Sequence, residues 1–205
     1  MKLRPITAKD FEFIIDLDKK VYPLSGLITK KVISQWFVRN PEYGMIFEDE
    51  GKIVGVCIII PLNREGWEKM VKGKLFEFEV REKDIFKDNE IGLHFCHIEK
   101  LTDIKNFTKL CFDDLRNILG NKKVIGMSAV CVSKSGLALF KDKFNFKERE
   151  YKFDEHILEK NGKKIIADGT EEEVRKKYSD YTYHNRCELV ILYPNEKSLA
   201  WEYLK

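Results

Sequence analysis

One short, mostly apolar stretch of the chain carries several side chains that can exchange protons. Residues 91–99 read IGLHFCHIE. Free histidine has a pKa of about 6.5, which suits abstraction of a proton at neutral pH. His94 is therefore the first candidate for a general base, and Glu99 is a second. The alternative for His94, and the preferred interpretation of His97, is a histidine packed in the core and hydrogen-bonded to the backbone.

An extended conformation decides which of these side chains can act together. Alternation places His94 and Cys96 on one face of a strand, and His97 and Glu99 on the other. A β-bulge would exchange the faces beyond it. Because residues i and i+3 diverge on a regular strand, the two histidines are not expected to bind a metal. The five cysteines form no C-x-x-C pair, so neither a zinc site nor a redox pair is expected.

Composition excludes several classes of protein. The 205 residues are 43% hydrophobic and 35% charged, which is ordinary for a globular chain, and the net charge is +3. Acidic and basic residues are interspersed, so no nucleic-acid partner is expected. The longest apolar run, residues 53–62, is too short for a membrane span of about 20 residues. Unpaired cysteines and a charged N-terminus favour a cytoplasmic protein without disulfides.

The hydrophobic pattern predicts strands that alternate with helices. Strands are predicted at residues 2–6, 44–48, 53–61, 91–99, 124–132, 146–158 and 187–193. Helices are predicted at residues 11–21, from 29 to before 40, near 67–71, at 107–119 and 135–143, and over the charged segment 171–177. Thr7 and Asp10 have the spacing of a capping box before the first helix. One mixed α/β domain, residues 1–205, accounts for these elements, and its segment 155–205 is the less typical part.

Four segments in this order resemble the GNAT superfamily of acetyl-CoA-dependent N-acetyltransferases. Residues 3–10, LRPITAKD, resemble the opening strand, threonine and helix of many members. Residues 51–55, GKIVG, are similar to the family's hairpin. The strand, loop and helix of residues 93–119 and the ending of the last helix at residues 139–146 complete the resemblance.

The resemblance implies an α/β (α+β) GNAT fold, in which a mixed central β-sheet has helices on both faces. Two parallel strands, residues 91–99 and 124–132, would splay apart and form the cleft for acetyl-CoA as co-substrate. The pantetheine arm would pair with the exposed backbone of the first strand, at His97, Ile98, Glu99 and Lys100.

The family's pyrophosphate loop has the pattern Gln/Arg-x-x-Gly-x-Gly/Ala, and the aligned residues 103–108 contain neither glycine. Asparagine tolerates a positive φ, so Asn106 could keep the shape of the loop. Asp103 would be unfavourable if it pointed inward. The residues assigned to the phosphates are Lys105, Asn106, Phe107, Thr108 and Lys109. The alternative is a degenerate loop that no longer binds the cofactor.

The resemblance also implies an acid that protonates the leaving thiolate, commonly a tyrosine in the last helix. Phe140 stands at that position and is assigned to packing against the cofactor. The helix is one residue longer than the family's usual form, and a shift of one residue would place Lys141 there. Ser133 matches a position that contacts pantetheine in the family. Tyr151, on the following strand, is the substitute candidate for the acid.

The expected function is transfer of an acetyl group from acetyl-CoA to a primary amine on a small molecule, a peptide or a protein. The alternative is a non-catalytic GNAT-like module with weak or no affinity for CoA. No metal, nucleic-acid or membrane partner is expected. Pairing into a homodimer, as in many relatives, is a further expectation. Binding of acetyl-CoA separates the two functions.

Overall fold

A computed structural model describes residues 1–21, 28–148 and 155–205. The strands are β1 (Lys2–Pro5), β2 (Gly44–Asp49), β3 (Lys52–Leu62), β4 (Glu90–Lys100), β5 (Lys123–Cys131), β6 (Lys147–Glu148), β7 (Glu155–Lys160), β8 (Lys163–Asp168), β9 (Thr182–Arg186) and β10 (Glu188–Leu192). The α-helices are α1 (Phe11–Val21), α2 (Lys30–Phe37), α3 (Arg64–Val71), α4 (Phe107–Leu119), α5 (Lys134–Leu137), α6 (Glu171–Lys177) and α7 (Leu199–Leu204).

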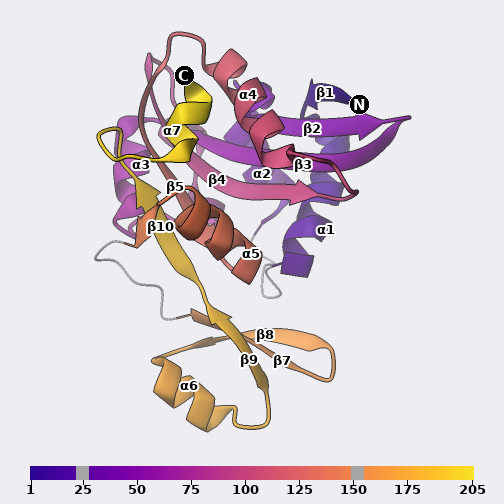
Figure 1. Cartoon of the computed structure of the whole chain (residues 1–205), viewed down its shortest axis with the longest axis vertical. Helices are drawn as coiled ribbons and strands as arrows, with labels where there is room; N and C mark the ends of the chain where they lie inside the picture. The colour runs from indigo at the N-terminus through magenta and orange to yellow at the C-terminus, as the bar shows by residue number, and fades with distance from the viewer. Residues whose placement is uncertain (22–27, 149–154) are drawn as a thin grey trace.

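The main sheet has seven strands in the order β1-β2-β3-β4-β5-β10-β6. All neighbouring strands are antiparallel except β4 and β5, which are parallel and are connected through α4. In Figure 1, α4, α5 and α7 lie in front of this sheet, and α1 and α2 lie behind it. The predicted mixed sheet with helices on both faces is therefore confirmed.

Several predicted elements match the structure closely. Residues 107–119 form α4 and residues 11–21 form α1, as the apolar spacing indicates. Asp10 accepts hydrogen bonds of 2.8 Å from both the backbone N–H and the hydroxyl of Thr7, which confirms the capping box. Arg4 binds the same carboxylate at 2.7 Å, so this corner ties β1 to the start of α1.

The predicted strand over residues 146–158 differs from the structure. β6 belongs to the main sheet, whereas β7 belongs to a second sheet of order β8-β7-β9. Figure 1 shows this sheet and α6 beyond the lower end of the main sheet. Leu158, Ala167 and Val174 form a small core of their own there, while Ile157 belongs to the main core. The charged segment 171–177 forms the predicted helix.

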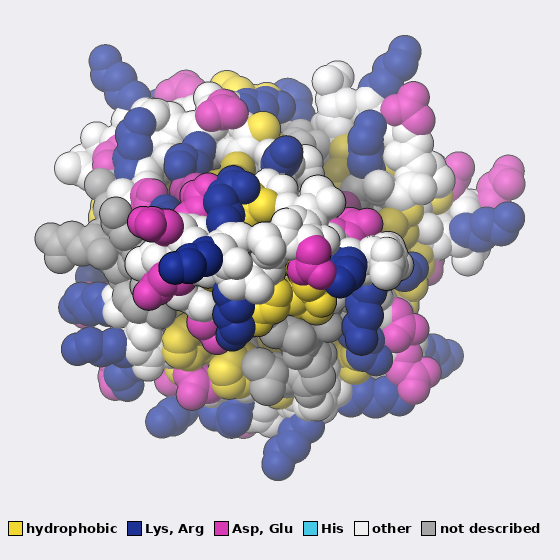
Figure 2. All heavy atoms as spheres, turned by 90° about the horizontal axis from the view of Figure 1, so that it is seen from below, with side chains coloured by type: hydrophobic (Ala, Val, Ile, Leu, Met, Phe, Trp, Pro, Cys, Tyr) yellow, Lys and Arg dark blue, Asp and Glu magenta, His cyan; other side chains and the backbone are white. Residues whose placement is uncertain are grey.

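One face of the molecule shows how its charged side chains are distributed. On the face seen from below, basic and acidic side chains are interspersed around the second sheet (Figure 2). Within the described ranges, the helices are all too short or too polar to cross a membrane.

The N-terminal halves of β4 and β5 are held together around one tryptophan. Gly92 and Gly126 are register partners on these two strands. A Cβ atom at either glycine would lie 2.3 Å from the indole of Trp67, which comes from α3 and is buried. The two glycines thus form a slot for the ring and hold α3 against the parallel pair.

We expect Gly92→Ala to destabilise the protein, because the added methyl group would displace the buried indole. Overpacking of a core costs about 1–3 kcal/mol. The measurement is the free energy of unfolding from urea titration. As a control, the cost of the same substitution should shrink in a Trp67→Leu background, where the slot is wider. An equal cost in both backgrounds would contradict this packing.

Candidate functional site

The parallel pairing of β4 and β5 ends at Phe95 and Ala129, and a cavity opens beyond that point. Its volume is about 700 Å³. Both strands contribute their facing edges, α4 contributes its first turn, and α5, the following helical turn and α7 close the sides. The lining residues are Phe95, Cys96, His97, Ile98, Glu99, Lys100, Ile104, Asn106, Phe107, Thr108, Lys109, Val130, Cys131, Val132, Ser133, Ser135, Gly136, Leu139, Phe140, Lys143 and Tyr203.

Most of the residues assigned to the cofactor line this one cavity. They come from the end of β4, the start of α4, and the segment 133–140. Lys105 is exposed and lies outside the lining. The structure therefore brings together segments that are distant in the sequence, around the free edges of two parallel strands.

The loop before α4 keeps its shape through Asn106. This residue has φ 55° and ψ 28°, in the left-handed region that asparagine tolerates best after glycine. The side chain of Asn106, the N-cap residue, makes no capping hydrogen bond to α4. The first helical hydrogen bond runs from Leu110 N–H to the Asn106 carbonyl at 3.1 Å. The N–H groups of the first turn thus have no partner within the helix, and such a helix end attracts anions.

The start of α4 is anchored by the aromatic ring of Phe107. This side chain is 5% exposed and meets Phe47 edge-to-face, with ring centres 5.0 Å apart. A Cβ atom at Gly55 would lie 2.6 Å from the same ring, so the second glycine of GKIVG leaves the space that Phe107 fills. The hairpin motif therefore fixes the position of the helix end that faces the cavity.

Charged side chains surround this helix end. The Asp103 side chain is 91% exposed and lies 3.3 Å from the ammonium of Lys100, so it points to solvent. Lys109 pairs with Asp113 at 2.6 Å, and its ammonium lies 5.9 Å from the centre of the Tyr203 ring. The aspartate that replaces the family's basic or amide residue therefore does not oppose an anion in the cavity.

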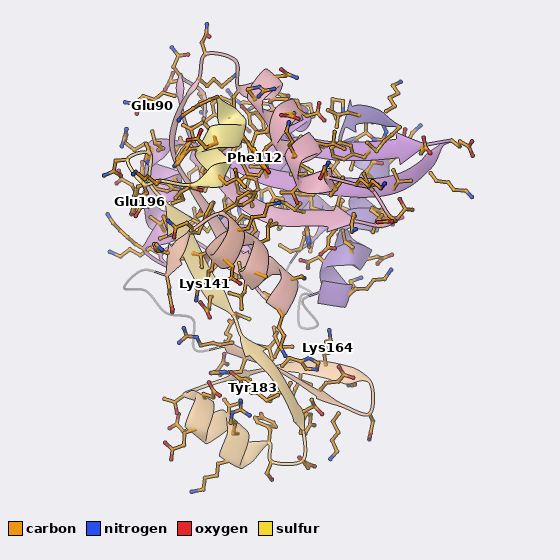
Figure 3. The ribbon with its side chains drawn as sticks, in the orientation of Figure 1. Glu90, Phe112, Lys141, Lys164, Tyr183 and Glu196 are labelled. Atoms are coloured by element: carbon orange, nitrogen blue, oxygen red, sulfur yellow. The ribbon has the colours of Figure 1, made fainter. Side chains whose placement is uncertain are left out.

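The last helix of this region absorbs its extra residue as a π-helical turn, η5 (Ala138–Lys143), which continues α5. An extra residue in an α-helix is commonly accommodated in this way. Phe140 is buried beside Phe95, with ring centres 5.6 Å apart. Lys141, labelled in Figure 3, donates to Glu188 of β10 at 2.5 Å and is not part of the lining.

Ser133 begins α5, and its hydroxyl accepts a hydrogen bond of 3.0 Å from Gly136 N–H. If Ser133 contacts pantetheine as predicted, its hydroxyl would make that contact in addition to the capping hydrogen bond. Tyr151, the candidate acid, lies outside the described residues.

A β-bulge at Cys96 reorders the faces of β4. His97 pairs with Ile58, and Phe95 with the adjacent Ile59, so one extra residue lies on β4. His94 and His97 consequently point to the same side of the sheet. The bulge thus exchanges the faces of the strand beyond it. The expectation that the two histidines diverge is therefore wrong. Within the described part of the chain, no three His, Cys, Asp or Glu residues are grouped to hold a metal ion.

His94 is completely buried, and both of its ring nitrogens are engaged. Nδ1 lies 2.9 Å from the hydroxyl of Ser128 on β5, and Nε2 lies 2.8 Å from Oε1 of Glu77. Glu77 belongs to the short 3-10 helix η3 (Glu77–Glu79), and its carbonyl accepts from Trp36 Nε1 at 3.1 Å. His94 does not line the cavity. Its hydrogen bonds join β4 to Ser128 of β5 and to Glu77, which is a structural role.

His97 and Glu99 lie on the cavity wall. The Nε2 atom of His97 is 3.5 Å from Oδ1 of Asp18 on α1, and both side chains are buried. Burial raises the pKa of Glu99, and the nearby His97 opposes this rise. Burial also raises the pKa of the Cys96 thiol, and the charges of Glu77 and Asp18 add to the effect. Two carboxylates therefore flank the bulge on the side of α1.

Sequence reasoning missed Asp18, Glu77 and Tyr203. Asp18 and Glu77 belong to segments far from β4 in the sequence, and no local pattern marks either as a partner of a histidine. Tyr203 lies on α7, where the spacing of Leu199, Ala200 and Tyr203 is a weak helical signal. The position of α7 against α4 follows only from the tertiary structure.

Comparison with known proteins finds this fold in acetyltransferases. No protein-family model and no curated protein matches the chain. A polyamine N-acetyltransferase of Drosophila melanogaster shares 12% identity over 94% of this chain and 99% of its own, with a TM-score of 0.51. Diaminobutyrate acetyltransferase EctA of Paenibacillus lautus shares 12% identity over 96% of both chains, at 0.49. The loading GNATL domain of CurA from Lyngbya majuscula shares 16% identity over 63% of both chains, at 0.42.

At such low sequence identities, the comparison supports a common fold only. The sheet order of this chain and its parallel pair β4 and β5 are consistent with that fold. The chain therefore has the GNAT fold, as its sequence motifs indicate.

Proposed function

We propose that the protein is an N-acetyltransferase that transfers the acetyl group of acetyl-CoA to a primary amine. The observation that carries the proposal is the cavity between the separating ends of β4 and β5, with the uncapped first turn of α4 at its edge. A free strand edge offers backbone N–H and C=O groups to the amides of a pantetheine arm. The helix end offers N–H groups to its phosphates.

The residues present fit this ligand without the family's glycines. Asn106 supplies the left-handed backbone, Phe107 anchors the helix, and Lys109 contributes positive charge. When bound, acetyl-CoA supplies a thioester, whose acyl carbon is open to attack by an amine. The chain's own task is to orient the two substrates and to remove a proton from the amine.

One observation favours the second candidate function, a non-catalytic module. Phe140 stands where the family commonly has its tyrosine, and its ring is packed among Phe95, Phe144 and Phe146. A thiol with a pKa of about 8.5 needs little help to leave as a thiolate, so this exchange does not prevent acyl transfer. A protein that binds acetyl-CoA and releases CoA only when an amine is added would decide for the enzyme.

We expect acetyl-CoA to bind the purified protein, and Asn106→Pro to weaken the binding about tenfold or more. Proline requires a φ near −65°, which is incompatible with the observed +55°. Asn106→Gly is the matched control, since glycine adopts the same backbone freely and should keep the affinity. Isothermal titration calorimetry measures all three proteins. Equal affinities for the proline and glycine variants would remove the loop from the binding site.

We expect His94→Ala to reduce stability rather than acetyl-CoA affinity. The substitution leaves the buried hydroxyl of Ser128 without its partner and opens a cavity, and an unsatisfied buried group costs about 1–3 kcal/mol. Urea unfolding measures the loss. His184→Ala is the control, because the partly exposed pair of His184 with Glu159 should contribute less than about 1 kcal/mol. A fully stable His94→Ala protein with lost turnover would instead restore His94 as a catalytic base.

A further inference from the structure

The short helix α7 contributes one aromatic side chain to the cavity. Tyr203 is half-buried and lines the cavity beside the first turns of α4. Its ring meets Phe112 and Phe144 edge-to-face, with ring centres 5.8 and 6.0 Å apart. Two such contacts from different elements fix the orientation of the ring. A fixed aromatic ring therefore borders the cavity close to the end of α4 that faces it.

Further contacts hold α7 in place, so the position of Tyr203 does not depend on its ring alone. Trp201 Nε1 donates to the Tyr193 carbonyl at 3.0 Å, and Ala200 is completely buried. Arg116 Nη1 of α4 donates to the Tyr203 carbonyl at 3.4 Å. Figure 1 shows α7 beside α4. The helix is thus part of the framework that encloses the cavity.

The charged side chains of the lining are mostly positive. Among the described residues, three lysines line the cavity, Lys100, Lys109 and Lys143, against one carboxylate, Glu99. Each of the first two lysines pairs with an aspartate outside the lining. Lys143 is exposed and forms no ion pair with another described residue. This balance of charge favours an anionic ligand, and Lys143 is the cation free to meet it.

The aromatic ring and the ammonium groups lie close together. Lys109 Nζ is 5.9 Å from the centre of the Tyr203 ring. Lys143 Nζ is 5.7 Å from the centre of the Phe144 ring, which itself contacts Tyr203. Aromatic side chains hold nucleobases by stacking, and lysine binds phosphate as a point charge. The combination fits a ligand that carries both an aromatic base and a phosphate group.

The donor of the proposed function has these two groups at the end away from its thioester. Its pantetheine arm would follow β4, and its pyrophosphate would lie at the first turn of α4. Within the described part of the chain, the lining next to that turn comes from α7 and from the end of η5. The nucleotide that follows the pyrophosphate therefore meets Tyr203 and Lys143.

We propose that Tyr203 stacks on the adenine base of acetyl-CoA and that Lys143 binds its 3′-phosphate. This assignment rests on the proposed function and adds to it the residues that select the donor. A thioester of phosphopantetheine on a carrier protein has neither an adenine base nor a 3′-phosphate. The site thus favours free acetyl-CoA over a carrier-bound acetyl group.

The first experiment removes one phosphate from the ligand. Isothermal titration calorimetry compares acetyl-CoA with its 3′-dephospho derivative. We expect the wild-type protein to bind acetyl-CoA about tenfold more tightly, because a charge-assisted contact is lost without the phosphate. Lys143→Gln should bind both ligands with nearly equal affinity. Lys176→Gln, an exposed lysine on α6, is the matched control and should keep the wild-type preference. Equal affinities of the wild-type protein for both ligands would overturn the role of Lys143.

The second experiment tests the aromatic ring. Tyr203→Leu should weaken the binding of acetyl-CoA about tenfold, since stacking on the base is lost. Tyr203→Phe is the matched control, because it keeps the ring and should keep the affinity. Adenosine 3′,5′-bisphosphate should displace acetyl-CoA from the wild-type protein, and less effectively from Tyr203→Leu. A folded Tyr203→Leu protein that binds acetyl-CoA as tightly as the wild type would overturn the stacking.

Circular dichroism and urea unfolding accompany each variant, because Tyr203 also packs against Phe112 and Phe144. Should Tyr203→Leu fail to fold, the displacement by adenosine 3′,5′-bisphosphate still tests the nucleotide site on the wild-type protein. No displacement at millimolar concentration would overturn it. Failure of the wild-type protein to bind acetyl-CoA at all would overturn the proposed function, which is a different result from binding that ignores the nucleotide.

Discussion

The candidate site exists because the parallel pairing of β4 and β5 stops at Phe95 and Ala129. Before that point, the slot for Trp67 holds the two strands together. Beyond it, each strand keeps a free edge, and the cavity lies between them. The bulge at Cys96 falls at the same place and brings His97 beside Asp18 of α1. Hydrogen bonding within the sheet thereby determines where the cavity opens.

Departures from the family's sequence pattern are absorbed by the backbone. Asn106 adopts a left-handed conformation in place of glycine, and η5 takes up an extra residue as a π-helical turn. Neither change removes the open helix end or the cavity. Phe140 contributes an aromatic ring to the lining of the cavity. The altered motif therefore changes the lining of the site more than its framework.

Local patterns predicted the elements well, because periodicity and capping act within a few residues. The bounds of α1 and α4 and the capping box at Thr7 follow from such patterns. The division of residues 146–158 between two sheets does not, since strand pairing depends on distant partners. The same reason explains the site: the strand with His97 was identified from sequence, but Asp18 and Tyr203 reach it only through packing of α1 and α7.

The second sheet lies within the chain between β6 and β10, which are adjacent strands of the main sheet. Joining Glu148 to Val190 therefore closes a long loop, and the entropy cost of closure grows with the logarithm of loop length. The second sheet brings its own ends together, because His156 pairs with Arg186 and Cys187 N–H donates to the Glu155 carbonyl at 2.8 Å. Once the second sheet is folded, the loop that remains to be closed between β6 and β10 is effectively shorter. The stability of the second sheet therefore contributes to the pairing of β6 with β10 at the edge of the main sheet.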